Sequence, residues 1–265
     1  MKNFNVEHRV AVVTGGSSGI GLETAALLLD QGARVAICGR SAERLRDAAQ
    51  DLQQRFPAAE LLAHGGDVLD AASMTGFAAA VRERFGTADM LICNAGQGRV
   101  ASLQETSEQD WLDETRLKLF GVLNPLNAFL DLLHQSGIAS LTCVNSLLAL
   151  QPEPHMIATS AARAALLNMT HSLAHEYAAQ GIRVNSILLG MIESGQWRRR
   201  FAQRSEQEME WSEWTAGIAA RRGIPMGRMG RPQEPAQALL FLASPLSSYT
   251  TGSCLDVSGG FNRHL

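Results

Sequence analysis

Three closely spaced glycines near the N-terminus have the spacing of an anion-binding loop. Gly15, Gly19 and Gly21 follow a β-branched run at residues 10–13 and precede a run typical of a helix at residues 22–29. Strand, glycine turn and helix together place free backbone N–H groups and the positive end of a helix dipole beside an anion. Glycine suits this turn because a Cβ would keep a pyrophosphate from the backbone. The stretch predicts a pyrophosphate-binding loop, although loops that bind nothing also use glycine.

Alternating strand and helix patterns follow this loop along the whole chain. We expect further strands at residues 32–38, 61–64, 89–93, 138–144, 182–188 and 253–257, and helices at residues 41–55, 107–133, 156–180 and 232–243, with another helix ending near residue 85. This alternation predicts one doubly wound α/β domain over residues 1–265, a parallel sheet of about seven strands with helices on both faces. Ligands of such sheets lie at the carboxyl ends of the strands.

The composition excludes several classes of function. The 265 residues, 46% of them hydrophobic, suffice for a sizeable core, and a net charge of -3 gives no electrostatic signature of nucleic-acid binding. No apolar run approaches membrane-spanning length, and residues 1–9 lack the core of a signal peptide. We therefore expect a cytoplasmic protein with neither nucleic acid nor membrane as a partner.

The cysteines and lysines are few. All four cysteines fall in predicted strands and lack metal-ligand spacing, which predicts buried, inert thiols and no metal site: Cys38, Cys93, Cys143 and Cys254. The chain has only two lysines, Lys2 and Lys118, so nearly all of its positive charge is arginine.

Further motifs follow the glycine loop in a fixed order. They are Gly66-Asp67-Val68, Asn94-Ala95-Gly96, residues 182–186 (IRVNS), residues 225–232 (PMGRMGRP) and residues 256–260 (DVSGG). With TGGSSGIG at residues 14–21, they resemble the TGxxxGxG loop, the adenine-contacting aspartate, the NAG strand end, the IRVN strand and the C-terminal signatures of the short-chain dehydrogenase/reductase family. The resemblance covers essentially the whole chain. It implies a Rossmann-type fold, a nicotinamide cofactor, a small-molecule substrate and a homodimer or homotetramer.

The resemblance also implies which residues bind the cofactor. They are Gly15, Ser17, Ser18, Gly19, Ile20, Gly21, Arg40, Ser41, Asp67, Val68, Asn94, Ala95, Gly96, Arg163, Gly190, Ile192 and Ser194. Ser194 takes the place of a threonine that usually hydrogen-bonds the nicotinamide carboxamide. The family's Pro-Gly after the sixth strand is Leu189-Gly190 here, so the proline is missing.

The residues after the second predicted strand favour NADP(H) over NAD(H). Gly39 takes the position of the acid that accepts hydrogen bonds from the NAD ribose, and Arg40 follows it. A guanidinium suits the 2′-phosphate of NADP, and Ser17 or Ser41 could donate hydroxyl hydrogen bonds to it. The alternative is a surface arginine at a helix start, which the helix dipole disfavours.

The catalytic positions carry unusual residue types. The family uses an asparagine, a serine, a tyrosine and a lysine, and these positions fall on Lys118, Ser146, Thr159 and Arg163. No shift of register restores the tyrosine, because the only tyrosines are Tyr177 and Tyr249.

The replacements change the chemistry that is available. A phenol with a pKa of about 10 can be tuned by a nearby cation, whereas a threonine hydroxyl is far less acidic. The ordinary tyrosine mechanism is therefore excluded. Arg163 stays protonated and can hold ribose hydroxyls or stabilise an oxyanion. Losing a positioned acid typically removes about 10²–10⁴-fold in rate, so hydride transfer by proximity could survive in slow form.

Two interpretations of the altered pocket compete with simple decay. In the first, Lys118 and Arg163 place two cations near the nicotinamide with Ser146 between them, which would suit an anionic or strongly polarised substrate, and Lys118 acts as cation or proton donor. Its alternative is a lysine that reaches to solvent along the long helix. In the second, the chain resembles the dienoyl-CoA reductase branch, which also has a small residue at the tyrosine position. That branch keeps the lysine, however, and this chain does not.

Two further features border the expected cleft. His155, which precedes the Thr159 helix, is a candidate catalytic group with a near-neutral pKa, or else a surface-loop histidine. Residues 191–225, rich in arginine and tryptophan, correspond to the family's mobile substrate flap. They could close over an acidic substrate or CoA phosphates, or they could form an amphipathic helix whose tryptophans pack on a neighbouring subunit. His171 and His175 are expected at solvent or at a subunit contact.

Two functions therefore stay open. The leading one is an NADP(H)-dependent oxidoreductase that moves hydride to or from a small carbonyl, alcohol or conjugated substrate through Ser146, Lys118 and Arg163. The rival is a catalytically silent cofactor-binding homologue with a sensing or scaffolding role.

Overall fold

Seven parallel strands form a single sheet in the computed structural model of the chain, which describes residues 4–204 and 208–263. The strands are β1 (Val10–Thr14), β2 (Arg34–Gly39), β3 (Leu61–Gly65), β4 (Met90–Cys93), β5 (Ser140–Ser146), β6 (Arg183–Leu189) and β7 (Cys254–Val257). Their order, β3-β2-β1-β4-β5-β6-β7, reverses direction between β1 and β4. A reversal of this kind opens a crevice at the carboxyl ends of the strands. The predicted doubly wound sheet is confirmed.

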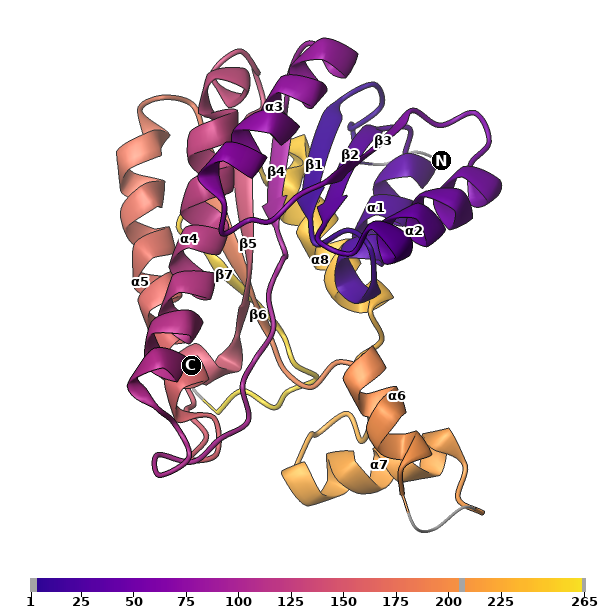
Figure 1. Ribbon diagram of the computed structural model, residues 1–265, viewed down its shortest axis with the longest axis vertical. Helices are drawn as coiled ribbons and strands as arrows, with labels where there is room; N and C mark the ends of the chain where they lie inside the picture. Colours follow the sequence, from indigo (N-terminus) through magenta and orange to yellow (C-terminus); the bar gives the residue numbers. More distant parts are fainter. Residues whose placement is uncertain (1–3, 205–207, 264–265) are drawn as a thin grey trace.

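Helices cover both faces of the sheet (Figure 1). On one face lie α3 (Ala71–Phe85), α4 (Glu108–Leu133) and α5 (Ile157–Ala178), and on the other lie α1 (Gly19–Asp30), α2 (Ala42–Arg55) and α8 (Gln233–Ala243). Two short helices, α6 (Gly195–Ala202) and α7 (Trp211–Arg222), project from the body. Single 3-10 turns form η1 (Leu147–Ala149) and η2 (Pro245–Ser247).

The alternation of side chains along β1 builds two cores from one strand. Val10 and Val12 enter the core beneath α3 and α4, while Ala11 and Val13 enter the core beneath α1 and α8. All four are fully buried, as expected for a central parallel strand covered on both faces. These two cores fix the sheet, and the sheet fixes the loops at its carboxyl edge.

The predicted elements agree with the observed ones to within a few residues. The polar segment after β6, for which an amphipathic helix was one of two interpretations, forms two helices, α6 and α7, with residues 205–207 outside the described part. The expectation of buried thiols holds for Cys38, Cys93 and Cys143, whereas Cys254 is only half-buried. Burial raises the pKa of the Cys38 and Cys143 thiols to about 12, which keeps them unreactive.

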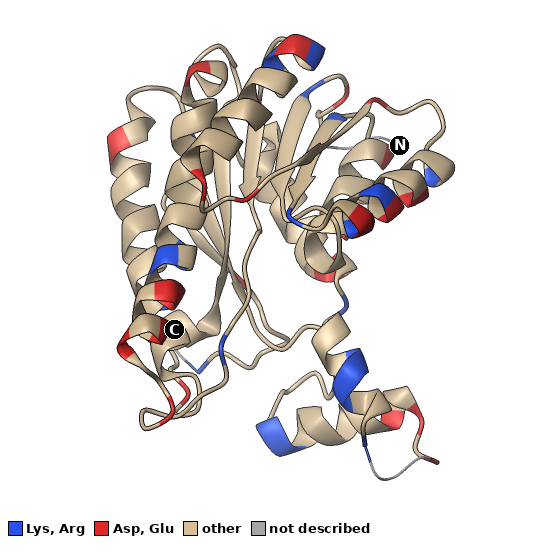
Figure 2. Cartoon of the chain, in the orientation of Figure 1, with Lys and Arg blue, Asp and Glu red and all other residues tan. Residues whose placement is uncertain are grey.

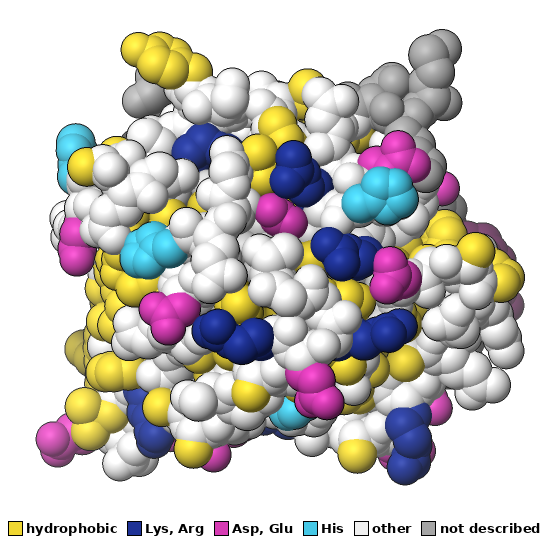
Figure 3. All heavy atoms as spheres, turned by 90° about the horizontal axis from the view of Figure 1, so that it is seen from above, with side chains coloured by type: hydrophobic (Ala, Val, Ile, Leu, Met, Phe, Trp, Pro, Cys, Tyr) yellow, Lys and Arg dark blue, Asp and Glu magenta, His cyan; other side chains and the backbone are white. Residues whose placement is uncertain are grey.

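The surface carries charges of both signs. Figure 3 shows the end of the molecule at the top of Figure 1, where basic and acidic side chains are interspersed. Within residues 4–204 and 208–263, no helix combines the length and the apolar character needed to cross a bilayer. Lys2 lies outside the described residues.

Candidate active site

A cavity of about 860 Å³ lies at the carboxyl edge of the sheet. That volume is ordinary for a ligand or cofactor site. Most of the predicted site residues line it: Gly15, Ser17, Ser18, Gly19, Ile20, Arg40, Asp67, Val68, Asn94, Ala95, Gly96, Ser146, His155, Thr159, Arg163, Gly190, Ile192 and Ser194. Three predicted site residues do not line it: Gly21, Ser41 and Lys118.

Hydrogen bonds from Asn94, at the end of β4, fix the glycine loop. The Asn94 side-chain amide donates to the carbonyl oxygens of Thr14 and Gly15, both at 3.1 Å. A Cβ on Gly21 would overlap Asn94 Nδ2 and the Gly15 carbonyl, so this glycine permits the close contact between loop and strand. Asn94 thus acts on the cofactor site through the loop.

The first turn of α1 is suited to an anion. Ser18 is its N-cap, yet its side chain makes no capping hydrogen bond. The first backbone N–H groups of a helix have no intrahelical acceptor, so here they remain available beside the cavity. This geometry fits a pyrophosphate.

The end of β2 fits a 2′-phosphate. Arg40 lines the cavity, and so does Arg44, one turn into α2, which the sequence analysis missed. A Cβ on Gly39 would approach Ser17 Oγ to 2.9 Å, so a side chain at this position would have to displace the Ser17 hydroxyl. Ser41 instead caps α2, where its hydroxyl oxygen accepts from the backbone N–H of Arg44 at 3.4 Å.

The opposite end of the cavity is shaped by the segment after β6. A Cβ on Gly190 would lie 2.8 Å from Ser258 Cα, so glycine is required there even without the preceding proline. Ile192 forms a β-bridge with Gly230. Ser194 caps α6 by accepting from the backbone N–H of Trp197 at 3.5 Å, and it lines the cavity.

Ser146, at the end of β5, and Arg163, on α5, both line the cavity. The Ser146 hydroxyl lies 3.3 Å from the Leu189 carbonyl oxygen, a long hydrogen bond that a ligand oxygen can replace. Arg163 Nη1 donates to the Val144 carbonyl at 2.7 Å, while its buried Nε has no partner in the described residues. Burial lowers the pKa of Arg163 to about 10, so it remains a cation at neutral pH.

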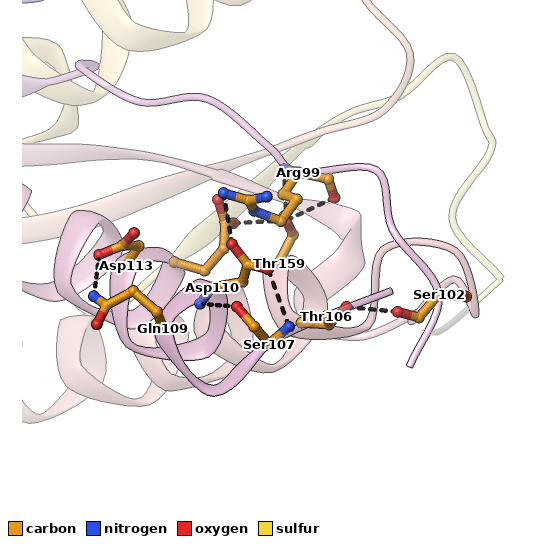
Figure 4. A network of polar contacts seen from close by, with 9 residues as sticks. Arg99, Ser102, Thr106, Ser107, Gln109, Asp110, Asp113 and Thr159 are labelled. Carbon is orange, nitrogen blue, oxygen red and sulfur yellow. Dashed lines mark hydrogen bonds and ion pairs between the residues drawn. The ribbon is translucent and has the colours of Figure 1, made fainter. Parts of the chain in front are cut away.

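The Thr159 hydroxyl is already engaged within the protein. Its oxygen accepts from the backbone N–H of Arg99 at 2.9 Å, and its hydrogen is directed to Glu114 Oε2 at 2.6 Å. Arg99 also pairs with Asp110 at 2.9 Å, in the capping box with which Ser107 begins α4 (Figure 4). Thr159 therefore ties α5 to the loop after β4 and to the start of α4.

Lys118 is buried, and the prediction that it might reach to solvent is wrong. Its ammonium donates to the Gln97 carbonyl at 2.8 Å and to Glu114 Oε2 at 3.0 Å. Burial, together with the nearby charge of Arg163, lowers the pKa of Lys118 to about 8, against the opposing effect of Glu114. Two cations do lie near the pocket as predicted, but only Arg163 lines it. Glu114 was missed, although it stands four residues before Lys118, the spacing of a helical ion pair.

His155 lies at the cavity mouth with its side chain 49% exposed. Its Nδ1 is 3.8 Å from Glu153 Oε2, and the same carboxylate pairs with Arg222 of α7 at 3.3 Å. Glu153 thus connects the loop before α5 to the flap. His171 and His175 of α5 are both exposed.

The flap, residues 191–225, contains an aromatic cluster and brings Trp197 and three arginines to the cavity. Its rings, Trp197, Phe201, Trp211 and Trp214, pack on one another with centroids 5.2–6.0 Å apart and join α6 to α7. Figure 2 shows basic residues on α6 and at the end of α7. Three of them line the cavity: Arg200, Arg221 and Arg222.

Comparisons with known proteins agree with this geometry. A family model described as enoyl-(acyl carrier protein) reductase matches residues 15–262. An uncharacterized short-chain type dehydrogenase/reductase of Sinorhizobium fredii is 35% identical over 266 residues, which cover 97% of this chain and 98% of the relative. The chain belongs to the short-chain dehydrogenase/reductase family.

Two solved structures of one bacterial protein are closely similar. They show the apo and NADPH-bound forms of a short chain oxidoreductase from Pseudomonas aeruginosa PAO1, described as containing an atypical catalytic center. The apo form is 56% identical with a TM-score of 0.97, and the NADPH-bound form is 55% identical with a TM-score of 0.95. Each comparison covers 99% of this chain and 100% of the other.

Proposed function

We propose that the protein is an NADP(H)-dependent oxidoreductase that acts on a small anionic carbonyl, alcohol or conjugated substrate. The observation that carries the proposal is one continuous cavity with the glycine loop, Arg40 and Arg44 at one end and Ser146 with Arg163 at the other. The NADPH-bound structure of the Pseudomonas protein supports the choice of cofactor.

The residues of the cavity divide the work of binding and activation. The backbone N–H groups at the start of α1 would hold the pyrophosphate, and Arg40 and Arg44 the 2′-phosphate. When bound, the nicotinamide supplies or accepts a hydride. Ser146 donates a hydrogen bond to the substrate oxygen, and Arg163 stabilises negative charge on that oxygen without giving up a proton.

The flap supports an anionic substrate. Arg222 is neutralised by Glu153, but Arg200 and Arg221 have no carboxylate partner in the described part of the chain. Arg200 lies over the Trp197 ring at 4.9 Å, which leaves its positive charge uncompensated. Both arginines line the cavity from the flap and not from the end of β2, so they suit a carboxylate or phosphate on the substrate.

Paired substrates test this function. Keto acids or acyl phosphoesters serve as anionic substrates, and their esters or amides serve as the neutral counterparts. NADPH oxidation is followed by absorbance with each member of a pair. We expect turnover of the anionic substrates. R221Q should lower kcat/KM about tenfold for the anionic substrates alone, since a charge-assisted hydrogen bond contributes about 1.5–3 kcal/mol. R199Q, which removes a flap arginine outside the cavity lining, is the matched control. Equal rates for anions and neutral esters would contradict the anionic substrate.

A silent cofactor-binding protein is the second candidate. One observation favours it, because the Thr159 hydrogen is held by Glu114 and the position of the family's proton donor is thus occupied internally. Tight NADPH binding by calorimetry with no oxidation across carbonyl, enoyl and imine substrates would support this candidate over the enzyme.

The pH profile should show the charge of Lys118. A lysine with a lowered pKa keeps its proton below that pKa and loses it above, so the ammonium beside Arg163 is present below about pH 8 and absent above it. We expect kcat/KM for NADPH-dependent reduction to fall as the pH rises through about 8, because the pocket then loses one of its two nearby positive charges. The variant K118R, whose side chain stays charged, should keep its rate to higher pH. An unchanged falling limb in K118R would assign that limb to another group.

A further inference from the structure

Glu114 is a buried carboxylate for which the proposed reaction has no role. It lies on α4, one helical turn before Lys118, and only 4% of the residue is exposed. A single oxygen, Oε2, meets the Thr159 hydroxyl at 2.6 Å and the Lys118 ammonium at 3.0 Å. A buried carboxylate is unfavourable without partners, so these two contacts are what permit it.

We propose that Glu114 is a positioning residue of the active site, which holds the Lys118 ammonium and the Thr159 hydroxyl fixed behind Arg163. Its importance for turnover rests on the proposed function, whereas its hold on Lys118 does not. Glu114 is an acid next to a site whose four catalytic positions carry only two cations and two hydroxyl groups.

The charges around Lys118 give this carboxylate its effect. The positive charge of Arg163, on α5, disfavours the Lys118 ammonium, whereas Glu114, on α4 with Lys118, favours it. Arg99 and Asp110, at the start of α4, neutralise each other as an ion pair. With Glu114 ionised, the buried group carries one net positive charge. Without the Glu114 charge, the cations Lys118 and Arg163 repel each other in a low-dielectric environment, and Lys118 is the one that can lose its proton.

Glu114 also fixes the backbone at the cavity edge. Because the Thr159 hydrogen is held by the carboxylate, the hydroxyl oxygen presents a lone pair to the Arg99 N–H. Lys118 binds the neighbouring carbonyl of Gln97. Both hydrogen bonds hold the loop after β4, whose residues 94–98 and 100 line the cavity.

Because the chain has only two lysines, the effect of Glu114 on the pKa of Lys118 can be measured directly. With ¹³Cε-labelled lysine, the whole chain gives two side-chain NMR signals, and K2R identifies the signal of Lys118. In E114Q, which keeps the shape and removes the charge, we expect Lys118 to titrate about 1–3 pH units lower than in the wild type. The shorter acid in E114D should restore part of that shift.

The controls separate this role from general damage and from the enzyme proposal. D113N makes the same charge change at the adjacent, exposed position and should leave the Lys118 titration nearly unchanged. An unchanged Lys118 titration in both E114Q and E114D would overturn the role of Glu114. The measurement needs no substrate, so a Glu114-dependent titration in a protein without turnover would contradict the proposed function alone. Where turnover exists, the falling limb of its pH profile should move with the Lys118 titration.

Discussion

Replacing Gly21 with alanine is expected to weaken NADPH binding by about a hundredfold or more. The added Cβ would overlap the Gly15 carbonyl and the Asn94 amide, and neither can withdraw without moving the glycine loop. The Asn94 amide is already committed to the Thr14 and Gly15 carbonyls. Overpacking of this kind costs about 1–3 kcal/mol, and a displaced loop also misaligns the N–H groups that hold the pyrophosphate. Calorimetric titration with NADPH measures the loss.

A second glycine-to-alanine change provides the control. Gly76 lies within α3, and a Cβ there would enter open space. The variant G76A should bind NADPH as the wild type does and should be more stable by about 0.5–1 kcal/mol in urea unfolding, since alanine is the better helix former. If G21A bound NADPH with wild-type affinity, Asn94 and the loop would not be coupled as the contacts indicate.

The parts of the site that sequence predicted well are those fixed by backbone geometry. Gly15 and Gly190 are required because a Cβ at either position would meet backbone atoms, and such constraints leave a glycine at a recognisable place in a motif. The strands were found for a related reason, since a central parallel strand such as β1 is buried on both faces and must be apolar throughout.

The parts that sequence missed depend on side-chain direction. A lysine on a long helix can reach solvent or turn inward, and Lys118 turns inward because Glu114 and the Gln97 carbonyl are there to receive it. Arg44 was missed because it comes one turn after the expected position, and only the path of α2 brings it beside Arg40. Contacts between α4 and α5, such as Glu114 with Thr159, span 45 residues and leave no local pattern.

The aromatic flap shows a similar limit. Its composition was compatible with closure over a substrate and with contact to a second subunit, and the structure adds that the four rings pack chiefly on each other. Trp197 alone among them also lines the cavity. The rings therefore make α6 and α7 one packed unit, and Trp197 connects that unit to the cavity.

Replacing Arg40 with alanine is expected to reverse much of the preference for NADPH over NADH. Both nucleotides share the pyrophosphate site on α1, so only the 2′-phosphate distinguishes them at the end of β2. One charge-assisted contact to a phosphate contributes about 1.5–3 kcal/mol, which corresponds to about a 10–100-fold rise in the NADPH dissociation constant. The NADH constant should change little. R44A should show a smaller effect in the same direction, because Arg44 lies one turn further along α2.

A third arginine on the same helix makes the result specific. R46A removes an exposed cation from α2 that does not line the cavity, and so it reports the effect of lost surface charge alone. If R40A and R46A weakened NADPH binding equally, the preference would arise from the general field of α2. A loss confined to R40A and R44A would place the 2′-phosphate between them, next to Gly39, which stands where an NAD-binding relative has an acid. In that case nucleotide choice is decided by a missing side chain as much as by the arginines present.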